Sequence, residues 1–267
     1  MTLPSALRAV PTLFRVSFAE AVAYRTELLI WILTSTMPLI MLALWTAVAR
    51  EAPVGHYGER DFVAYFLAVF VVRQLTGTWI AWEMNQEVRQ GSIASRLLRP
   101  VPPILHYAAE TLSAIPLRLV VAVPVAALSL AVVGAERLPH SVLAWGAFVV
   151  ALAGGWLIAF LLSFCIGCLA FFLESSAKIM DLSLVLLFVF SGYLFPLDLL
   201  PQGLHLVVNG LPFRYQIGLP VELLVSAHTV SEAARLLVAQ WAWVAALLGL
   251  AAVLWRRGLA RYAAFGG

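Results

Sequence analysis

The chain has 267 residues, of which 63% are hydrophobic and 12% are charged, with a formal net charge of +3. Soluble domains usually have about 25% charged residues, so this composition excludes an ordinary soluble protein and indicates one surrounded by membrane lipid. The mean hydropathy of +0.94 points the same way. The few basic residues are too dispersed for a nucleic-acid-binding surface, and we expect no nucleic-acid partner.

The N-terminal segment, residues 1–27, predicts a helix that lies along the inner membrane surface. Apolar residues recur at spacings of three or four from Leu7 to Val22, and Ser5 is a suitable N-cap. Pro11 interrupts the pattern, so the apolar face is imperfect. We therefore expect an interfacial helix here and not a membrane span.

Six apolar stretches follow that can cross the membrane as helices. They lie at residues 28–49, 61–82, 107–134, 142–173, 179–195 and 230–255. The fifth is short, because about 17 residues of helix cover only about 25 Å. No soluble domain fits between the stretches. We therefore predict an all-α polytopic membrane protein with six transmembrane helices in a single domain, residues 1–267.

The basic residues predict the orientation in the membrane. If the N-terminus is inside, the inner segments hold ten of them and the outer segments five, as the positive-inside rule requires. The inner ones are Arg8, Arg15, Arg25, Arg89, Arg96, Arg99, Lys178, Arg256, Arg257 and Arg261, and the outer ones are Arg50, Arg60, Arg137, Arg214 and Arg235. We expect a multi-pass protein of the cell membrane with both termini in the cytoplasm.

The longest inner loop carries the polar stretch MNQEVRQGSIASRLLRPVPP. Residues 83–99 predict one short helix, with Ile93, Leu97 and Leu98 near one face. Pro100 and the prolines after it end this helix sharply and stiffen the return to the membrane. The stretch is either a solvated loop with positive-inside arginines or a rigid, exposed contact fixed to two spans.

The outer segment at residues 192–229 is too apolar for an ordinary water-exposed loop. Pro196 ends the fifth span early, and Pro201, Pro212 and Pro220 follow it. Short helices that re-enter or cap the outer leaflet would keep these apolar residues away from water. We therefore expect such helices between the fifth and sixth spans.

Arg73 and Arg118 fall near the middle of the second and third spans, where no acidic residue lies at a comparable depth. An arginine at that depth costs about 2.5–3.5 kcal/mol on insertion scales. One interpretation is that both line a polar translocation path, where they would meet a lipid phosphate or an acidic substrate. The alternative, which we favour, is that they bond backbone carbonyls freed near prolines, or the side chains of Gln74 and Thr76.

Small residues in the fourth span permit close helix packing. They are Gly154, Gly155, Ser163 and Gly167. They indicate either packing within one subunit or a seam between two subunits, and we expect the first.

The sequence carries no sign of an active site. The phosphate-binding pattern GxxxxGK[ST] is missing, so any ATP-driven transport needs an ATPase on another chain. Cys165 and Cys168 form a C-x-x-C pair in an apolar run, which we interpret as two buried side chains because a metal site needs more ligands. An intramembrane serine protease needs a histidine at the depth of its serine, and the histidines lie in loops or at span boundaries. We expect no catalytic residue and no metal.

Three motifs resemble those of ABC type-2 exporter permeases. The inner motif, E-x3-G-S-I-x3-L-L-R-P-V, covers residues 87–101. The outer motifs are G-Y-L-F-P-L-x-L-L-P at residues 192–201 and L-P-F-R-Y at residues 211–215. The six-span plan with an N-terminal interfacial helix also matches, so the resemblance covers nearly the whole chain.

The resemblance implies a permease subunit that pairs with a second permease, identical or homologous, and with two ATPase subunits. ATP and Mg²⁺ would bind to the ATPases, and this chain would bind no cofactor. Residues 83–106 would be the coupling loop that docks on the ATPase, and residues 192–229 the extracellular gate. The docking residues would be Glu87, Arg89, Gly91, Ser92, Arg96 and Arg99, and the gate residues Gly192, Phe195, Pro196, Leu200, Pro201 and Pro212.

The function that follows is ATP-driven export of an amphipathic, lipid-like or drug-like substrate from the cytoplasm. The alternative is an ATP-independent channel or a structural membrane protein. A neighbouring gene with the phosphate-binding pattern would favour the exporter.

Overall fold

The computed structural model describes residues 3–23, 36–134, 139, 141–174, 176–226 and 228–266. Apart from one isolated bridge between Val54 and Tyr57, regular secondary structure in these residues is helical, in agreement with the predicted all-α class. The helices are α1 (Leu3–Ala23), α3 (Met37–Glu51), α4 (Glu59–Thr76), α5 (Ile80–Gln90), α6 (Ile93–Leu97), α7 (Pro103–Ser113), α8 (Ile115–Val133), α9 (Val142–Cys168), α10 (Ala177–Phe190), α11 (Gln202–Gly210), α12 (Gly218–Val225) and α13 (Val230–Gly266).

Within the described residues, four helical stretches are long and apolar enough to cross a membrane. They are Glu59–Gln90, Pro103–Leu128, Val142–Phe171 and Val230–Tyr262, at the second, third, fourth and sixth predicted spans. At the first and fifth predicted spans, α3 and α10 have 15 and 14 residues. Residues 28–35, the start of the first predicted span, lie outside the described residues. The chain is therefore a polytopic membrane protein. The number of six spans stays a prediction.

The structure interrupts two of these stretches. The second is broken between Thr76 and Ile80, because Gly77 is extended, with φ −66° and ψ 137°. The third is broken at Ala114, two residues before Pro116. Proline has no backbone N–H and its ring crowds the preceding turn, so it is favourable only near a helix start.

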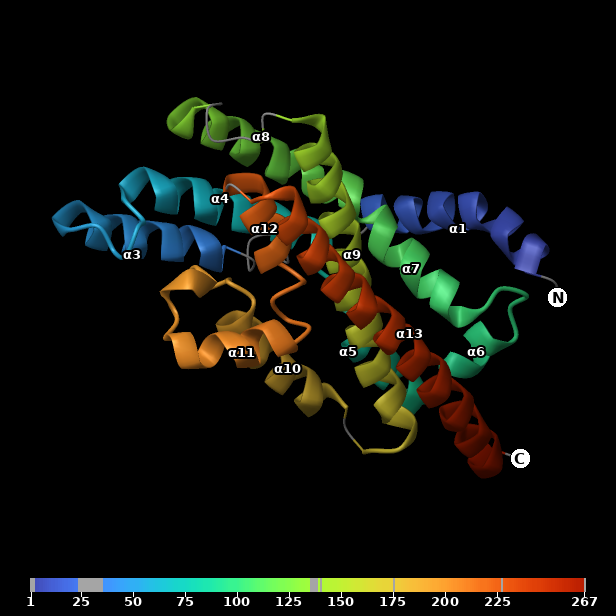
Figure 1. Ribbon diagram of the computed structural model, residues 1–267. Helices are drawn as coiled ribbons and strands as arrows, with labels where there is room; N and C mark the ends of the chain where they lie inside the picture. Colours follow the sequence, from blue (N-terminus) through green and yellow to red (C-terminus); the bar gives the residue numbers. More distant parts are fainter. Residues whose placement is uncertain are drawn as a thin grey trace.

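The two largest apolar cores of the described residues hold most of the helices together. In the larger one, α9 packs along α13 and against α5, and Figure 1 shows α9 and α13 crossing at the centre of the molecule. In the second, α3 and α4 pack against the segment that follows α10. α8 covers a further side of α4, and the N-terminal helix α1 lies against α7. The predicted N-terminal helix is thus present, and its place at the membrane surface stays a prediction.

The glycines of α9 pack within this one chain, as expected. A Cβ at Gly154 would lie 2.5 Å from the Gln240 side chain of α13. At Gly155 it would lie 2.6 Å from the carbonyl oxygen of Gln216. Each glycine therefore lets another part of the same chain approach the α9 backbone.

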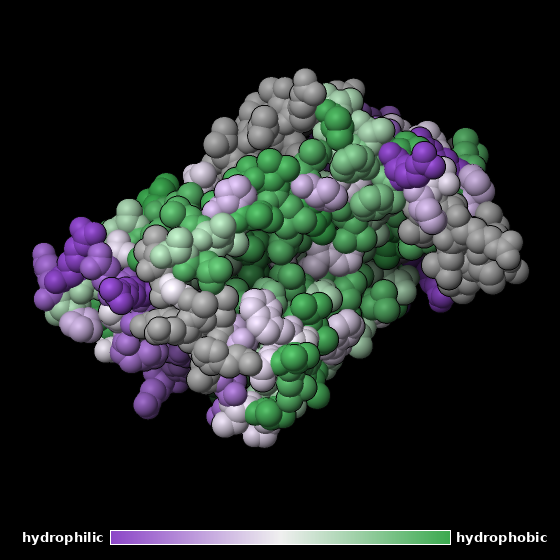
Figure 2. Space-filling model, turned by 90° about the horizontal axis from the view of Figure 1, so that it is seen from above, coloured by the Kyte–Doolittle hydropathy of each residue, from purple (hydrophilic) through white to green (hydrophobic). Residues whose placement is uncertain are grey.

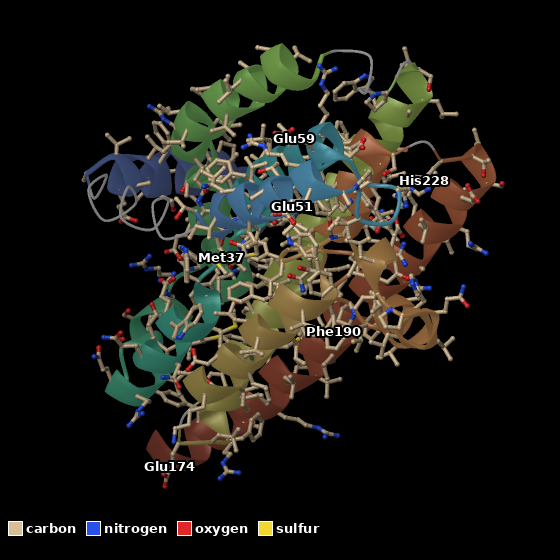
Figure 3. All side chains as sticks on the ribbon, turned by 90° about the vertical axis from the view of Figure 1, so that its left-hand side faces the viewer. Met37, Glu51, Glu59, Glu174, Phe190 and His228 are labelled. Atoms are coloured by element: carbon tan, nitrogen blue, oxygen red, sulfur yellow. The ribbon has the colours of Figure 1, made fainter. Side chains whose placement is uncertain are left out.

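The molecule has an apolar middle and polar ends. Figure 2 shows hydrophobic side chains across the middle of the face in view and hydrophilic ones at both ends. One end carries α6, the start of α1 and the end of α13, and the opposite end carries α11 and the α3–α4 turn (Figure 1). Figure 3 looks onto this second end, where Glu51 and Glu59 flank the turn. An apolar band between two polar ends is what a protein that crosses a membrane presents to lipid and water.

Candidate functional site

The polar inner stretch folds as two helices, so the prediction of one helix over residues 83–99 is wrong. Gly91 follows α5 with a left-handed φ of 76°, a conformation that other residues rarely adopt, and the five-residue α6 begins after it. Ile93 is fully buried, whereas Leu98 is 88% exposed. The expected shared face of these two residues is also wrong, because residues five positions apart lie about 140° apart around a helix, and Leu98 keeps helical backbone angles. An isolated apolar side chain this exposed is a candidate contact for another protein.

Arg96 does not point into solvent, although the sequence suggested that it meets a partner. Its guanidinium donates hydrogen bonds to carboxylate oxygens of Glu83, Glu87 and Glu110, at 2.5 to 2.8 Å. The guanidinium carbon lies 4.4 Å from the ring centroid of Tyr107, whose hydroxyl donates to Glu87 at 2.5 Å. Only 11% of the Arg96 side chain is exposed. Arg96 therefore joins α6 to both α5 and α7.

Electrostatics keep Arg96 charged in this position. Burial alone would lower its pKa, but the three carboxylates around it raise the pKa above its usual range. The ion pairs are partly shielded from water, and each uses a different edge of one planar guanidinium. The result is a rigid joint between the short helix and the ends of two membrane helices. The other predicted docking residues are accessible: Arg89, Gly91, Ser92 and Arg99 are exposed, and Glu87 is half-buried.

Arg118 is bound to backbone at the break in the second span. Its Nη1 donates to the carbonyl oxygen of Gly77 at 2.7 Å and to that of Gln74 at 3.3 Å. Carbonyls at the C-terminal end of a helix have no partner within the helix and carry its negative dipole end. The structure thus bears out backbone bonding for Arg118. The carbonyls are freed by the break at Gly77 and not by Pro116 or Pro124.

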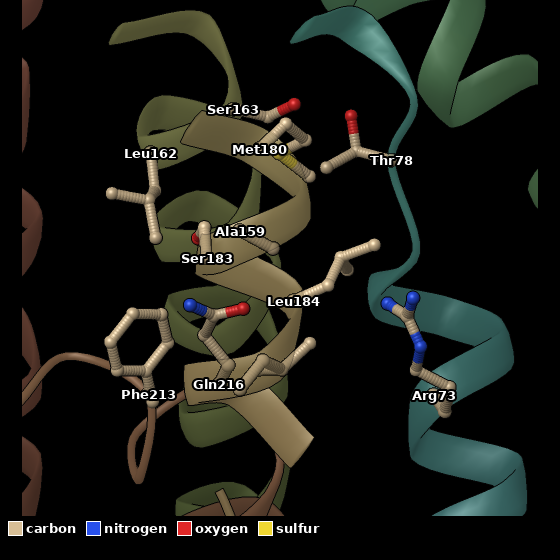
Figure 4. A pocket seen from close by; sticks show the side chains of 11 residues that line it. Arg73, Thr78, Ala159, Leu162, Ser163, Met180, Ser183, Leu184, Phe213 and Gln216 are labelled. Carbon is tan, nitrogen blue, oxygen red and sulfur yellow. The ribbon is translucent and has the colours of Figure 1, made fainter. Parts of the chain in front are cut away.

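Arg73 also lies beside this glycine. A Cβ at Gly77 would lie 3.3 Å from Nη1 of Arg118 and 3.7 Å from Nη1 of Arg73. The guanidinium of Arg73 lines a small cavity with Thr78 (Figure 4). The two arginines predicted near the middle of the membrane therefore meet, although they come from different spans.

The outer segment folds as a 3₁₀ turn (Leu197–Leu199) and the two short helices α11 and α12. It is fastened to the membrane helices by backbone carbonyls. Tyr65 of α4 donates to the carbonyl oxygen of Gly192 at 2.7 Å, and Trp45 of α3 donates to that of Leu194 at 2.9 Å. Among the predicted gate residues, Gly192, Pro196 and Pro212 are buried, Phe195 and Leu200 are half-buried, and Pro201 is exposed. Hence these residues form a structured cap and not a loose loop.

Sequence reasoning missed two anchors of this cap. Gln240, fully buried in α13, donates from Nε2 to the carbonyls of Ala151 and Tyr215, both at 2.8 Å. Arg214 forms an ion pair with Glu222 at 2.9 Å, and little of either side chain is exposed. A lone amide in the apolar run LLVAQWAWVAALL was a usable signal for Gln240. No sequence signal indicates the Arg214–Glu222 ion pair, because this contact depends on how the cap folds.

The two cysteines are buried, as expected from the sequence, and both are free thiols. Within the described residues, no group of three or more His, Cys, Asp or Glu side chains is placed to hold a metal ion. Arg96 at the inner joint, Arg118 at the helix break, and Arg214 and Gln240 at the cap bind other parts of this chain. They hold helices together and do not form an arrangement of nucleophile and base.

The described residues are helical apart from one isolated bridge and include several helices long and apolar enough to cross a membrane, which defines an integral membrane protein. Residues 27–266 match the family described as ABC-2 family transporter protein. The chain belongs to this family and is a permease subunit of an ABC transporter, whose membrane component is not itself catalytic and works with ABC ATPase partners. No match to the sequence is found among curated proteins.

Proposed function

We propose that this permease is half of the membrane part of an ATP-driven exporter in the cell membrane. Two ATPase subunits would bind ATP and Mg²⁺, a second permease would complete the membrane part, and this chain would bind no cofactor. The six spans would place both termini, α1 and α6 on the cytoplasmic side. The cargo would be an amphipathic, lipid-like or drug-like molecule moved out of the cytoplasm. Family membership and the polar ends of the molecule support this arrangement.

The observation that carries the proposal is the joint at Arg96. It connects α6, the exposed helix of the polar stretch, to α5 through Glu83 and Glu87 and to α7 through Glu110. α5 and α7 continue, across the breaks, into α4 and α8. A push on α6 by an ATPase would therefore tilt two membrane helices together instead of moving a loop. The predicted docking role of Arg96 then becomes a positioning role.

The outer cap is proposed as the gate that opens in response. It contacts α4 through the Tyr65–Gly192 hydrogen bond and α13 through Gln240. Tilting of α4 would pull on the first contact while the second holds the cap to α13. A cap fixed to two helices that move differently opens between them, which is the behaviour of a two-state gate.

Co-purification tests whether α6 is the docking element. The tagged permease would be purified together with the ABC ATPase encoded beside it, as wild type, as Leu98→Asp and as Leu206→Asp. Leu206 lies on α11 at the other end of the molecule and is 84% exposed, so it matches Leu98 in residue type and exposure. We expect the wild type and Leu206→Asp to retain the ATPase and Leu98→Asp to lose most of it. Equal retention by all three would argue against docking through α6. Failure of the wild type to retain any ATPase would favour a channel or structural role.

A further inference from the structure

A small polar cavity lies at the break between α4 and α5. Its polar lining comes from several elements: Arg73 from α4, Thr78 from the break, Ser163 from α9, Ser183 from α10 and Gln216 from the outer segment. In Figure 4, Arg73 and Thr78 form one wall, and side chains of α9 and α10 face them. The volume is about 20 Å³, room for about one water-sized group. This is a narrow polar space in an apolar part of the protein.

Two of the lining side chains have polar atoms that find no partner in the described structure. They are the hydroxyl of Thr78 and the amide nitrogen of Gln216. Both residues are more than nine-tenths buried, with 7% and 4% of their surface exposed. An unpaired buried polar group is unfavourable, so native proteins pair almost all of them. Two such groups from different elements line one cavity, which indicates that the cavity can hold a polar ligand.

The available hydrogen-bonding groups favour an anion. Arg73 offers guanidinium N–H groups, Gln216 an amide N–H and Thr78 a hydroxyl. Ser163 accepts from the backbone N–H of Ala81 at 3.1 Å, which leaves its own hydroxyl proton available. No acidic residue lines the cavity in the described part of the chain. The cavity lining therefore contains donor groups from several elements, and no described lining residue carries a negative charge.

The charge balance at Gly77 points the same way. The guanidinium groups of Arg73 and Arg118 both lie beside this glycine, and the hydrogen bonds that Arg118 donates go to two carbonyls. Two positive charges at membrane depth without a carboxylate are unfavourable. An anionic group in the cavity would offset part of this cost. We propose that the cavity binds a phosphate or carboxylate group, presented as the anionic headgroup of the transported amphiphile.

This inference rests on the proposed function, and it specifies the class of cargo. The cavity as it stands admits about one oxygen-sized group, so a whole headgroup requires its wall to move. Leu184 and Leu187 of α10 form part of that wall, while Leu182 and Val185 on the same helix are exposed. A short helix with an unpacked outer face is the wall most readily displaced. If α10 moved away from α4, the cavity would open toward the lipid. The headgroup could then enter the cavity while its acyl chain stayed in the membrane.

Thermal unfolding of the purified permease, followed by tryptophan fluorescence in a maltoside detergent, tests the site. Dodecyl phosphate is the anionic amphiphile, dodecylphosphocholine has the same chain with a zwitterionic headgroup, and inorganic phosphate is the free ion. We expect the midpoint temperature of unfolding to rise saturably with dodecyl phosphate and to stay unchanged with the other two probes. An equal rise with inorganic phosphate would overturn the assignment to an amphiphile. A rise with both detergents, or with no probe, would overturn the anion site.

Two variants assign the effect to the cavity. Thr78→Val removes a hydroxyl that has no partner, so the variant should fold, and its apparent affinity for dodecyl phosphate should fall about tenfold. Arg73→Gln should abolish the response. The control is Arg50→Gln, an exposed arginine that pairs with Glu59 at the outer end and should keep the wild-type response. An unchanged response in both Thr78→Val and Arg73→Gln would refute the site. This measurement needs no ATPase, so its result is independent of the co-purification. Either experiment can fail while the other succeeds.

Discussion

Arg118 Nη1 lies 2.7 Å from the carbonyl oxygen of Gly77, so an arginine of one membrane helix closes the broken end of another. α4 stops at Thr76, and its last carbonyls would otherwise face an apolar surrounding. The guanidinium gives them donors and places positive charge at the negative end of the helix dipole. The break in the second span is therefore a stable feature and not a local loss of order.

Replacing Arg118 should destabilise the protein. Arg118→Leu removes the donor and leaves two buried carbonyls unpaired, a loss of about 1–3 kcal/mol in the free energy of unfolding. Unfolding of the purified protein in increasing sodium dodecyl sulfate measures this. Arg235→Leu, at an exposed position near the start of α13, serves as the control and should change stability little. Equal stability of Arg118→Leu and wild type would show that the carbonyls do not need the arginine.

Removing the joint at Arg96 should separate ATP hydrolysis from transport. Arg96→Gln leaves three clustered carboxylates without their cation, and we expect a loss of about 2–3 kcal/mol in stability. We also expect the ATPase to stay bound, because Leu98 and Arg99 still face outward. Transport per ATP hydrolysed should fall severalfold.

Arg96→Lys should rescue this coupling only in part, since an ammonium cannot bond three carboxylates through a planar fork. The measurements are ATPase activity and substrate efflux in the same vesicles. If Arg96→Gln transports as efficiently per ATP as the wild type, the joint does not transmit force.

Gly192→Ala should damage the outer cap. Gly192 has a φ of 82°, and a Cβ there would lie 2.4 Å from the Tyr65 hydroxyl oxygen. The variant therefore has backbone strain and a steric clash together, for which we expect a loss of about 2–4 kcal/mol in stability. Gly203→Ala in α11, where the added Cβ meets nothing within 4 Å, is the matched control and should be neutral or slightly stabilising. A stable Gly192→Ala would mean that the backbone at this position can shift freely.

Much of the architecture was predictable because lipid imposes it. Long apolar runs must become helices in a membrane, and the runs near residues 61–82, 142–173 and 230–255 do so. The prolines of the outer segment predicted short helices, and α11 and α12 are present. The break at Gly77 was not predictable, since a glycine in an apolar run is as compatible with close packing as with a break.

The polar contacts were less predictable, because they form between distant segments. Glu83 and Glu87 are four residues apart and share a helix face, which the sequence does show. It does not show that Glu110 of α7 and Arg96 of α6 complete the cluster. For the same reason the sequence left both roles of the midplane arginines open. In the structure, Arg118 donates hydrogen bonds to backbone carbonyls, and Arg73 lines the cavity.

Site-specific crosslinking of α6 to the ATPase tests the central claim most directly. Cys165 and Cys168 are buried, so a single added thiol at Leu98→Cys or Leu206→Cys can be crosslinked selectively in assembled membranes. We predict a permease–ATPase crosslink from position 98 whose yield changes when ATP is added, and none from position 206. A crosslink from position 206 but not from position 98 would place the ATPase at the opposite end and contradict the account.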